Sequence, residues 1–342
     1  MSSKPLVSIL IPAYNAQKWI GETIQSALAQ TWPRKEIIVV DDGSKDETLA
    51  VARRFESRNV KVVTKANAGA AAARNKALSL SQGDYIQFLD ADDLLSPNKI
   101  ECQMLAAQSA ASPHILLSSS WVYFHYRTKN AAVVPTALWQ DLSPSEWLVR
   151  KMSQNLFMQT ATWLVSRELT LNAGPWDTRL LSDDDGEYFC RVLLASKGVK
   201  FVTDGMTYYR IPGYASLSYV GTSRPKLEAM LVSMRLHIQY LLSVEDSLRT
   251  RAACLTYLNN WHLQFLPDDY GMYAQLEQLA AELGGALKQP KLSWKYDWIW
   301  KLWGWGPARR AQTLLPGIRS MGVVQWDKLL HSLESRIPVR RF

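Results

Sequence analysis

Strand-like and helix-like segments alternate four times within the first 95 residues. The strand-like segments are short, continuous apolar runs, which are typical of strands buried on both faces of a sheet. They span residues 7–11, 37–40, 60–63 and 85–89, and the helix-like segments between them begin at 15, 47 and 68. This order predicts an α/β fold with a mostly parallel sheet and helices on its faces. In an open sheet of this kind, ligands bind beyond the carboxyl ends of the strands.

The rest of the chain is mixed in its middle and helical toward its end. Near the start, Asn15 is expected to cap the first helix and Pro33 to close it. Strands are expected at 114–125, 159–165, 199–203 and 206–211, and helices at 47–56, 68–80, 184–195, 223–243, 246–265 and 268–283. We therefore expect an α/β domain over residues 1–218 and a mostly helical region over 219–342.

The composition argues against several classes of protein. Of the 342 residues, 47% are hydrophobic and 20% are charged, which is ordinary for a globular chain with one large core and a smaller unit. The sequence contains no run of 18 apolar residues, so we expect no transmembrane helix. The N-terminus lacks the pattern of a signal peptide. The three cysteines have no paired spacing, so we expect core positions in a reducing compartment, the cytoplasm.

Most of the net charge of +8 lies in residues 291–342, which hold ten Lys and Arg against three Asp and Glu. Five tryptophans lie in the same segment, at positions 294, 298, 300, 303 and 305. An anionic membrane surface suits this mixture, because Trp favours the membrane interface and basic side chains attract anionic lipids. The alternative is a helical subdomain whose tryptophans pack on the rest of the protein. Nucleic acid would also suit such a mixture, but no nucleic-acid-binding motif supports it.

Three carboxylates crowd the end of the fourth strand-like segment, in the stretch Asp90-Ala91-Asp92-Asp93. Like charges this close repel each other, so such a cluster needs an offsetting charge or full solvation. Carboxylate oxygens bind hard divalent cations, especially where phosphate oxygens complete the coordination shell. The stretch therefore predicts either a cation site at Asp90 and Asp92 or a solvated turn in which Asp93 or Ser96 caps the next helix.

Two more polar stretches follow strand-like segments. In Asp41–Ser44 (DDGS), a carboxylate can accept a hydrogen bond from a base or a ribose, and Gly43 permits close backbone approach. The alternative is a plain type I turn. In residues 67–75 (NAGAAAARN), small side chains open a helix whose N–H groups suit phosphate, and Arg74 follows. The alternative there is a buried Ala-rich helix with a structural arginine.

Together, PAYN after the first strand, DDGS, NAGAAAARN and DADD resemble the family 2 glycosyltransferases, which have the Rossmann-like GT-A fold. The resemblance is dense over residues 5–100 and continues more weakly to about 218. It implies a nucleotide-sugar site and makes Asp92, with Asp90, the ligand of Mn²⁺ or Mg²⁺ through the donor diphosphate. The residues that it assigns to the nucleotide sugar are Pro12, Ala13, Tyr14, Asp41, Asn67, Gly69, Arg74, Asp90 and Ala91.

A second acidic stretch, SDDDGEYFCRVLL from Ser182, resembles the part of this family that supplies the catalytic base. A sugar hydroxyl is a poor nucleophile, and a nearby carboxylate can take its proton during attack. Asp185 is the first candidate, in frame with Glu187 and Arg191, and Asp184 is the second, because the tripled Asp leaves the register open by one. The alternative is that these acids only cap a helix.

Two other positions carry weaker expectations. Trp176 is expected either to shape the acceptor pocket or to lie in the core. The stretch 207–218 resembles a loop of this family that touches the diphosphate, and Arg210 would supply its positive charge.

These features predict an inverting, metal-dependent glycosyltransferase. It would transfer a sugar from a UDP-sugar to a hydroxyl of a glycan or lipid-linked saccharide in cell-surface polysaccharide synthesis, at the inner face of the membrane. One alternative is a non-catalytic glycan-binding or scaffold protein on a degenerate transferase fold, which predicts loss of an acidic stretch; both stretches are present. Another is a different nucleotide-binding α/β transferase, which predicts a Gly-rich loop where this chain has PAYN.

Overall fold

The computed structural model describes residues 4–110, 112–131, 133–211, 223–266, 271–288, 293–304, 307–308, 311 and 325–333. These residues form two compact units. The larger unit holds the described residues up to 122, from 133 to 209 and from 223 to 287. The smaller unit holds 123–131, 210–211 and the described residues from 288 onward.

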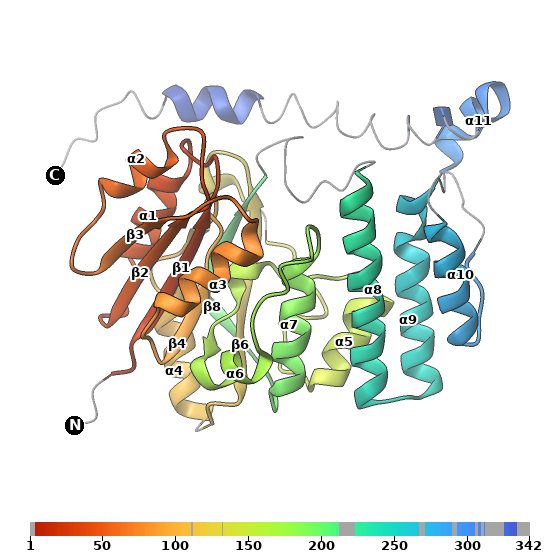
Figure 1. Cartoon of the computed structure of the whole chain (residues 1–342), viewed down its shortest axis with the longest axis horizontal. Helices are drawn as coiled ribbons and strands as arrows, with labels where there is room; N and C mark the ends of the chain where they lie inside the picture. Colours follow the sequence, from red (N-terminus) through yellow and green to blue (C-terminus); the bar gives the residue numbers. More distant parts are fainter. Residues whose placement is uncertain are drawn as a thin grey trace. The chain divides into compact units, whose positions relative to one another are not determined.

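The larger unit is built on a five-stranded sheet in the order β3-β2-β1-β4-β7 (Figure 1). Four strands run parallel, and the short β7 pairs antiparallel with β4. The strands are β1 (Val7–Ala13), β2 (Lys35–Asp41), β3 (Val60–Thr64), β4 (Tyr85–Phe88) and β7 (Val165–Ser166). The predicted mostly parallel α/β sheet is therefore confirmed.

Helices cover both faces of this sheet, which explains why β1 is apolar throughout. Ile9 and Ile11 belong to a core shared with helices α1 (Ile20–Leu28), α2 (Thr48–Arg53) and α4 (Lys99–Ala110). Leu10, between them, belongs to a second core shared with α3 (Ala70–Leu80) and with helices from later in the chain. Because alternate residues of a strand point to opposite faces, a strand covered on both faces needs apolar side chains throughout.

A second sheet has three strands in the order β5-β8-β6. They are β5 (Leu94–Leu95), β6 (Ile115–Phe124) and β8 (Gly198–Arg210). The two strands predicted at 199–203 and 206–211 are one strand, which continues through Gly205 at φ 99°. A Cβ at Gly205 would lie 2.8 Å from Lys99 Cα, so this glycine allows α4 to approach the strand.

The remaining helices of the larger unit pack beside the sheet. They are α5 (Pro144–Ser153), α6 (Arg167–Ala173), α7 (Asp184–Ala195), α8 (Arg224–Val244), α9 (Leu248–Trp261) and α10 (Met272–Glu282). Figure 1 shows α8, α9 and α10 side by side, and their apolar residues share the core of α3 and α7. The described helices between residues 223 and 287 thus share a core with the sheet. The predicted division of the chain at residue 218 stays a prediction.

Two local predictions are wrong. Asn15 does not cap the first helix, which begins at Ile20; it has φ 49°, and its side-chain oxygen accepts a hydrogen bond from Lys45 N at 2.8 Å. The strand predicted at 159–165 is mostly a 3₁₀ turn over Thr160–Thr162, and only Val165 enters β7.

The smaller unit contains α11 (Asp297–Trp303) and a helical segment at 325–333. The 325–333 segment is held by Asp327, whose carboxylate accepts hydrogen bonds from Arg127 Nε at 2.7 Å and from the backbone N–H of Tyr126 at 3.0 Å. Trp294, with 77% exposure, is the most open of the tryptophans described around α11. No helix within the described residues is long and apolar enough to cross a bilayer.

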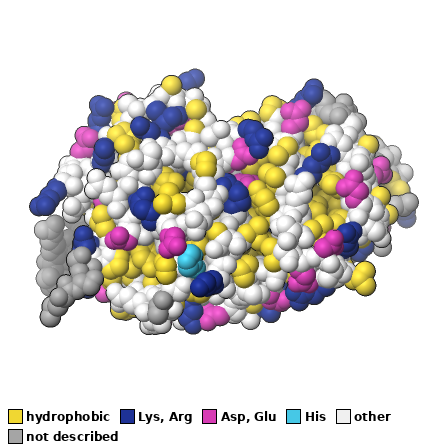
Figure 2. Space-filling view, turned by 60° about the horizontal axis from the view of Figure 1, so that its bottom comes forward, with side chains coloured by type: hydrophobic (Ala, Val, Ile, Leu, Met, Phe, Trp, Pro, Cys, Tyr) yellow, Lys and Arg dark blue, Asp and Glu magenta, His cyan; other side chains and the backbone are white. Residues whose placement is uncertain are grey.

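Basic and acidic side chains are mixed on the face of the molecule that Figure 2 shows. Figure 2 shows Lys and Arg side chains interspersed with Asp and Glu over the face in view. This pattern matches the near balance of basic and acidic residues outside 291–342.

Candidate active site

The carboxyl ends of three neighbouring strands bring the first group of predicted residues together. Ala13 of β1 is in register with Asp41 of β2, which is in register with Thr64 of β3. Asp41 Oδ2 accepts a hydrogen bond from Thr64 Oγ1 at 2.9 Å, whereas Asp41 Oδ1 is buried without a hydrogen-bond partner. A buried acceptor without a donor is costly, so this oxygen is suited to a ligand N–H or hydroxyl. Beside it Pro12 is buried, and Tyr14 is exposed.

The second acid of DDGS fastens the loop that leads into α3. The Asp42 carboxylate accepts hydrogen bonds from Gly69 N at 2.8 Å and from Lys65 Nζ at 2.6 Å. Asn67 Nδ2 donates to the Asp42 carbonyl at 2.9 Å. A Cβ at Gly43, which has φ 71°, would lie 2.9 Å from Asn67 N, so this close approach requires glycine. The predicted residues Asn67 and Gly69 therefore lie against DDGS at one edge of the sheet.

Arg74 joins the two acidic stretches. Its Nη2 lies 2.8 Å from Asp90 Oδ1, and its Nη1 lies 2.6 Å from Asp184 Oδ2. Burial alone would lower the pKa of Arg74, but the charges of Asp184 and Asp90 outweigh burial and raise that pKa. A fixed cation thus lies between carboxylates that are far apart in the sequence.

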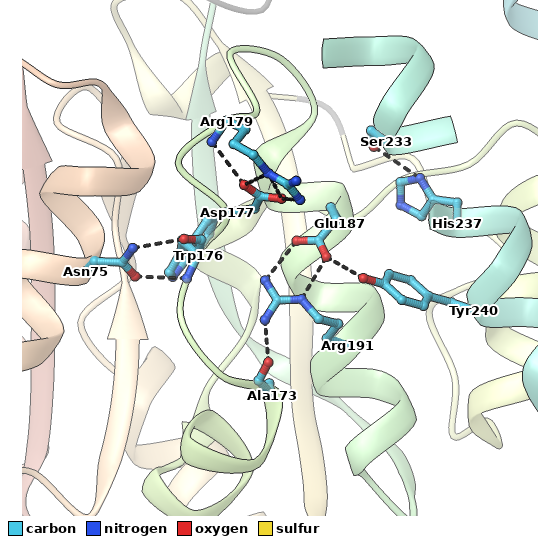
Figure 3. Close-up of polar contacts among 10 residues, drawn as sticks. All are labelled: Asn75, Ala173, Trp176, Asp177, Arg179, Glu187, Arg191, Ser233, His237 and Tyr240. Carbon is cyan, nitrogen blue, oxygen red and sulfur yellow. Dashed lines mark hydrogen bonds and ion pairs between the residues drawn. The ribbon is translucent and has the colours of Figure 1, made fainter. Parts of the chain in front are cut away.

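Trp176 is a core residue whose ring packs against the guanidinium of Arg74. Its side chain is buried at 1% exposure, and the Arg74 guanidinium carbon lies 4.4 Å from its ring centroid. The Trp176 ring stacks on Tyr188 with centroids 4.1 Å apart. Asn75 bonds both the backbone N–H and the carbonyl of Trp176 (Figure 3). Of the two expectations for this residue, the structure favours the core.

The DADD turn is held by its backbone and by its last acid. Thr23 Oγ1, on α1, contacts the carbonyls of Ala91 and Asp93 at 2.9 and 3.0 Å. Asp93 is fully buried, so a solvated turn does not describe it, whereas Asp90 and Asp92 are half-buried. Among the described residues, no three or more His, Cys, Asp or Glu side chains are grouped to hold a metal ion. A cation site made of two carboxylates and completed by substrate phosphates needs fewer protein side chains than such a group.

Asp184 and Asp185 open helix α7 and differ in their surroundings. Burial raises the pKa of Asp184 to about 6; Arg74 opposes this effect, and the charges of Asp185 and Asp90 add to it. Asp185 Oδ2 accepts a hydrogen bond from Thr160 Oγ1 at 3.0 Å, and its Oδ1 accepts one from Gly186 N at 2.9 Å. Each oxygen of Asp185 has its own donor, which fixes the plane of the carboxylate.

The turn that carries Thr160 also reaches the donor-side acids, because Gln159 Nε2 donates to Asp93 Oδ2. Residues 159 and 160 therefore contact both acidic stretches. Asp183 occupies the N-cap position of α7, but its side chain makes no capping hydrogen bond and accepts one from Ser233 instead.

Arg210 belongs to the smaller unit. It is 1% exposed; its Nη1 donates to the His125 carbonyl at 3.1 Å, and its guanidinium carbon lies 4.4 Å from the Phe124 ring centroid. Residues 212–218 of the predicted diphosphate loop lie outside the described residues. A contact of Arg210 with diphosphate stays a prediction.

Four residues of the site were not predicted: Thr23, Asp42, Gln159 and Thr160. Asp42 had a signal, since it lies beside Asp41 in DDGS. The other three had none, because each acts through a contact with a residue more than 20 positions away.

The chain is similar to known proteins in sequence and in fold. Residues 8–165 match the family model described as Glycosyl transferase family 2. The putative teichuronic acid biosynthesis glycosyltransferase TuaG of Bacillus subtilis is 44% identical over 104 residues, which are 30% of this chain and 41% of TuaG. Glycosyltransferase GlyG of Streptococcus pneumoniae is 29% identical over 217 residues, 60% of this chain and 70% of GlyG. The chain thus spans less than half the length of relatives such as TuaG.

Solved structures give the fold. S. aureus TarS 1–349 in complex with UDP-GlcNAc has a TM-score of 0.66 at 20% identity, over 81% of each chain. The mannosyltransferase PcManGT from Pyrobaculum calidifontis, in complex with GDP-Man and Mn²⁺, has a TM-score of 0.54 at 19% identity, over 96% of this chain and 89% of that one. The fold is therefore GT-A, and residues 8–165 of the chain match glycosyltransferase family 2.

Proposed function

We propose that this protein is an inverting glycosyltransferase that moves a sugar from a nucleotide-diphosphate sugar to an acceptor hydroxyl. The observation that carries the proposal is the position of Arg74, whose guanidinium bonds both Asp90 and Asp184. The donor-side and acceptor-side acids therefore face one another in a single cluster. Gathering like charges in this way is unfavourable, and it is typical of sites that bind or move charge.

The donor that the site suits best is a UDP-sugar. The neighbour TarS binds UDP-GlcNAc, which supports this choice of nucleotide. The free Oδ1 of Asp41 would accept a hydrogen bond from the base, with Pro12, Ala13 and Tyr14 lining the nucleotide. The loop at Asn67 and Gly69 would face the phosphates at the start of α3, where backbone N–H groups favour negative charge.

Asp90 and Asp92 would hold Mn²⁺ or Mg²⁺. Both are half-buried oxygen donors at the end of β4, and hard cations take one or two carboxylates when substrate phosphates complete the shell. PcManGT was solved with Mn²⁺, which supports the same kind of cation here. When bound, the cation would neutralise charge on the leaving diphosphate.

Asp185 would act as the general base. The acceptor oxygen attacks the anomeric carbon while Asp185 takes its proton, and the bond from that carbon to the diphosphate oxygen breaks with its electron pair on the leaving group. Attack from the face opposite the nucleotide inverts the carbon. Thr160 and Gly186 would hold the carboxylate in plane with the incoming hydroxyl. Such general-base help contributes roughly 10²–10⁴-fold to the rate.

The first test is binding. Uridine, guanosine, cytidine and thymidine diphosphates and their common sugars are added with and without Mn²⁺, and the melting temperature is followed. A ligand that binds only the folded protein raises this temperature. We expect a metal-dependent rise with one nucleotide and none for Asp92→Asn. No rise with any of them would favour a scaffold protein.

The second test is turnover of the donor selected in this way, measured as release of nucleoside diphosphate with water as acceptor. We expect Asp185→Asn to keep donor binding and to lose at least about 10²-fold in rate. Asp184→Asn is the comparison variant, and a greater loss there would move the base by one position. Release of pyrophosphate from a nucleoside triphosphate would point instead to a nucleotidyl transfer enzyme.

The acceptor would be a glycan or lipid-linked saccharide, reached from the membrane surface through residues 291–342. Trp298, Trp300 and Trp303 are half exposed or more around α11, among Lys295 and Lys301, and this pattern suits an anionic lipid interface. The relative TuaG, which is described for teichuronic acid biosynthesis, supports a polysaccharide setting.

Flotation with vesicles tests the membrane contact. We expect the protein to float with phosphatidylglycerol vesicles and not with phosphatidylcholine vesicles, and the triple change of Trp298, Trp300 and Trp303 to Ser to abolish this. Equal flotation of the variant would exclude α11 as the anchor. Changing the buried Trp176 to Phe serves as the matched aromatic control.

A further inference from the structure

Helix α7 begins in an unusual way. The residue before it, Asp183, has φ 56° and ψ 29°, a left-handed conformation that non-glycine residues seldom adopt. A residue in the N-cap position normally has an extended backbone and uses its side chain to cap the helix. Asp183 does neither. The two acids that follow it leave the helix start in a direction that this backbone conformation sets.

One face of α8 bonds to this helix start. Ser233, His237 and Tyr240 have the spacing i, i+4, i+7, so they share one face of the helix and form a stripe, here called the α8 stripe. Ser233 Oγ donates to Asp183 Oδ2 at 2.6 Å, and Tyr240 OH donates to Glu187 Oε1 at 2.7 Å. Figure 3 shows the three side chains directed from α8 toward α7.

His237 lies between these two contacts and is fully buried. Its Nδ1 lies 3.3 Å from Ser233 Oγ, and its Nε2 lies 3.0 Å from Lys151 Nζ on α5. An ammonium group only donates, so Nε2 is the acceptor and the proton of the neutral ring is on Nδ1. Burial first, and the charge of Lys151 second, lower the pKa of His237 to about 3, so the ring is neutral.

The donors then point one way along the chain of contacts. Lys151 donates to His237, the His237 Nδ1–H faces the Ser233 oxygen, and the Ser233 hydroxyl donates to Asp183. The Tyr257 hydroxyl also lies 3.4 Å from His237 Nδ1. A hydrogen-bond chain with its donors in one sense fixes the orientation of every member. The Asp183 carboxylate is the last member of that chain and lies two residues before Asp185.

We propose that the α8 stripe positions the catalytic base: Ser233, oriented by His237, holds Asp183 in its left-handed conformation and so aims Asp185 at the acceptor hydroxyl. The inference rests on the proposed function, in which Asp185 is the base. Ser233 and His237 are positioning residues, because they contact Asp183 and neither Asp184 nor Asp185 among the contacts described. The C-terminal helices thereby contribute to the reaction without touching the substrate.

A purely structural role gives different expectations. The Asp183 side chain is 35% exposed, so water can hydrogen-bond its carboxylate when the Ser233 hydroxyl is removed. Removing it should therefore release the backbone of Asp183 while leaving the fold intact. The apolar neighbours of Ser233 on α8, including Met230, Met234 and Ile238, are buried and keep the helix packed.

The test is Ser233→Ala, with Ser243→Ala as the matched control. Ser243 lies on the same helix, is exposed and bonds only to the carbonyl of Tyr240 among the contacts described. Turnover is followed as nucleoside diphosphate release from the donor selected above, together with the donor KM and the melting temperature. We expect Ser233→Ala to lower kcat at least tenfold with KM and melting temperature near those of the control.

Rescue separates positioning from loss of a contact. Glycine adopts a positive φ without strain, so it does not need to be held. We expect Asp183→Gly to restore part of kcat in the Ser233→Ala background, and Ser233→Thr, which keeps the hydroxyl, to retain most of it. A kcat loss accompanied by equal losses of donor binding and melting temperature would overturn the inference, as would an unchanged kcat in Ser233→Ala.

The failure of the proposed function has its own signature. If Asp185→Asn and Asp184→Asn both turn over donor like the original protein, the base assignment falls, whatever Ser233→Ala does. If Asp185→Asn is inactive while Ser233→Ala is fully active, the base assignment stands and the positioning role falls.

Discussion

At the scale of single residues, the site depends on side chains whose partners lie far away in the sequence. Asp41, Arg74, Asp90 and Asp92 could be singled out as candidates from sequence because each lies in a recognisable stretch at the end of a strand or in the first turns of a helix. Thr160 could not, because its role depends on a contact with Asp185 that only the folded chain creates. The wrong cap at Asn15 has the same cause: its side chain bonds Lys45, in a different loop.

Thr160→Val removes the hydroxyl that bonds Asp185 and preserves the shape of the side chain. Because a hydrogen bond to a charged group contributes about 1.5–3 kcal/mol, we expect kcat to fall about 10-fold or more, with donor affinity unchanged. Thr256→Val is the control, since that hydroxyl is exposed and bonds within α9. Equal kcat values for the two variants would contradict the role of Thr160.

Asp184 makes stability depend on pH. Its pKa is raised to about 6, so between about pH 4 and pH 6 the folded protein keeps a proton that the unfolded chain has released. The free energy of unfolding should therefore fall as pH rises through this range, by up to about 3 kcal/mol from this group.

Urea unfolding of the original protein and of Asp184→Asn at pH 4, 5, 6 and 7 measures this effect. The difference in unfolding free energy between the two should change over that interval and level off above pH 6. Parallel curves would show that Asp184 titrates alike in the folded and unfolded chain.

At the scale of elements, hydrophobic pattern located the parallel strands and the start of α7, because buried strands and amphipathic helices have strong periodicity. It missed α5 and α6 and misread residues 159–165. That segment is a 3₁₀ turn whose residues Gln159 and Thr160 are buried by contacts with both acidic stretches. Its buried residues resemble a strand in the sequence, although the side chains of Gln159 and Thr160 bond the two acidic stretches.

The loop before α3 tests one such element. Gly69 has φ 91°, so Gly69→Ala should strain the loop by about 1–2 kcal/mol and disturb the hydrogen bond from Gly69 N to Asp42. We expect donor affinity to fall about 10-fold, measured by titration calorimetry. Gly21→Ala is the control. Gly21 lies within α1, and a Cβ there would meet Val51 of α2 at 3.7 Å, an ordinary contact distance. Equal affinities for the two variants would show that the loop does not contact the donor.

At the scale of the whole molecule, the chain divides into two units that the sequence did not delimit. The charge step at residue 291 marked the last segment as different, but pattern alone gave no sign that residues 123–131 belong with it. Asp327 joins them, since its side chain bonds Arg127 and the backbone of Tyr126, and the rings of Tyr126 and His331 also lie 5.8 Å apart. Pairings over two hundred positions leave no trace in local periodicity.

Asp327→Ala should loosen the smaller unit while sparing the larger one. A carboxylate with three hydrogen bonds leaves unpaired donors when it is removed, at a cost of about 1–3 kcal/mol. We expect faster tryptic cleavage within 288–342 and an unchanged melting transition of the sheet unit. Asp297→Ala is the control, and equal cleavage rates for the two variants would show that Asp327 does not secure the segment.

One guanidinium serves two carboxylates, so the halves of the site form a single thermodynamic system. If Asp90 is substituted, Asp184 is the remaining ion-pair partner of Arg74. If Asp184 is substituted, Asp90 is the remaining partner. The two changes should therefore be non-additive, with a coupling free energy of about 0.5–3 kcal/mol in a double-mutant cycle. Substitutions that give this chain a new donor specificity would then also alter how the acceptor is deprotonated, because the donor-side and acceptor-side acids share Arg74.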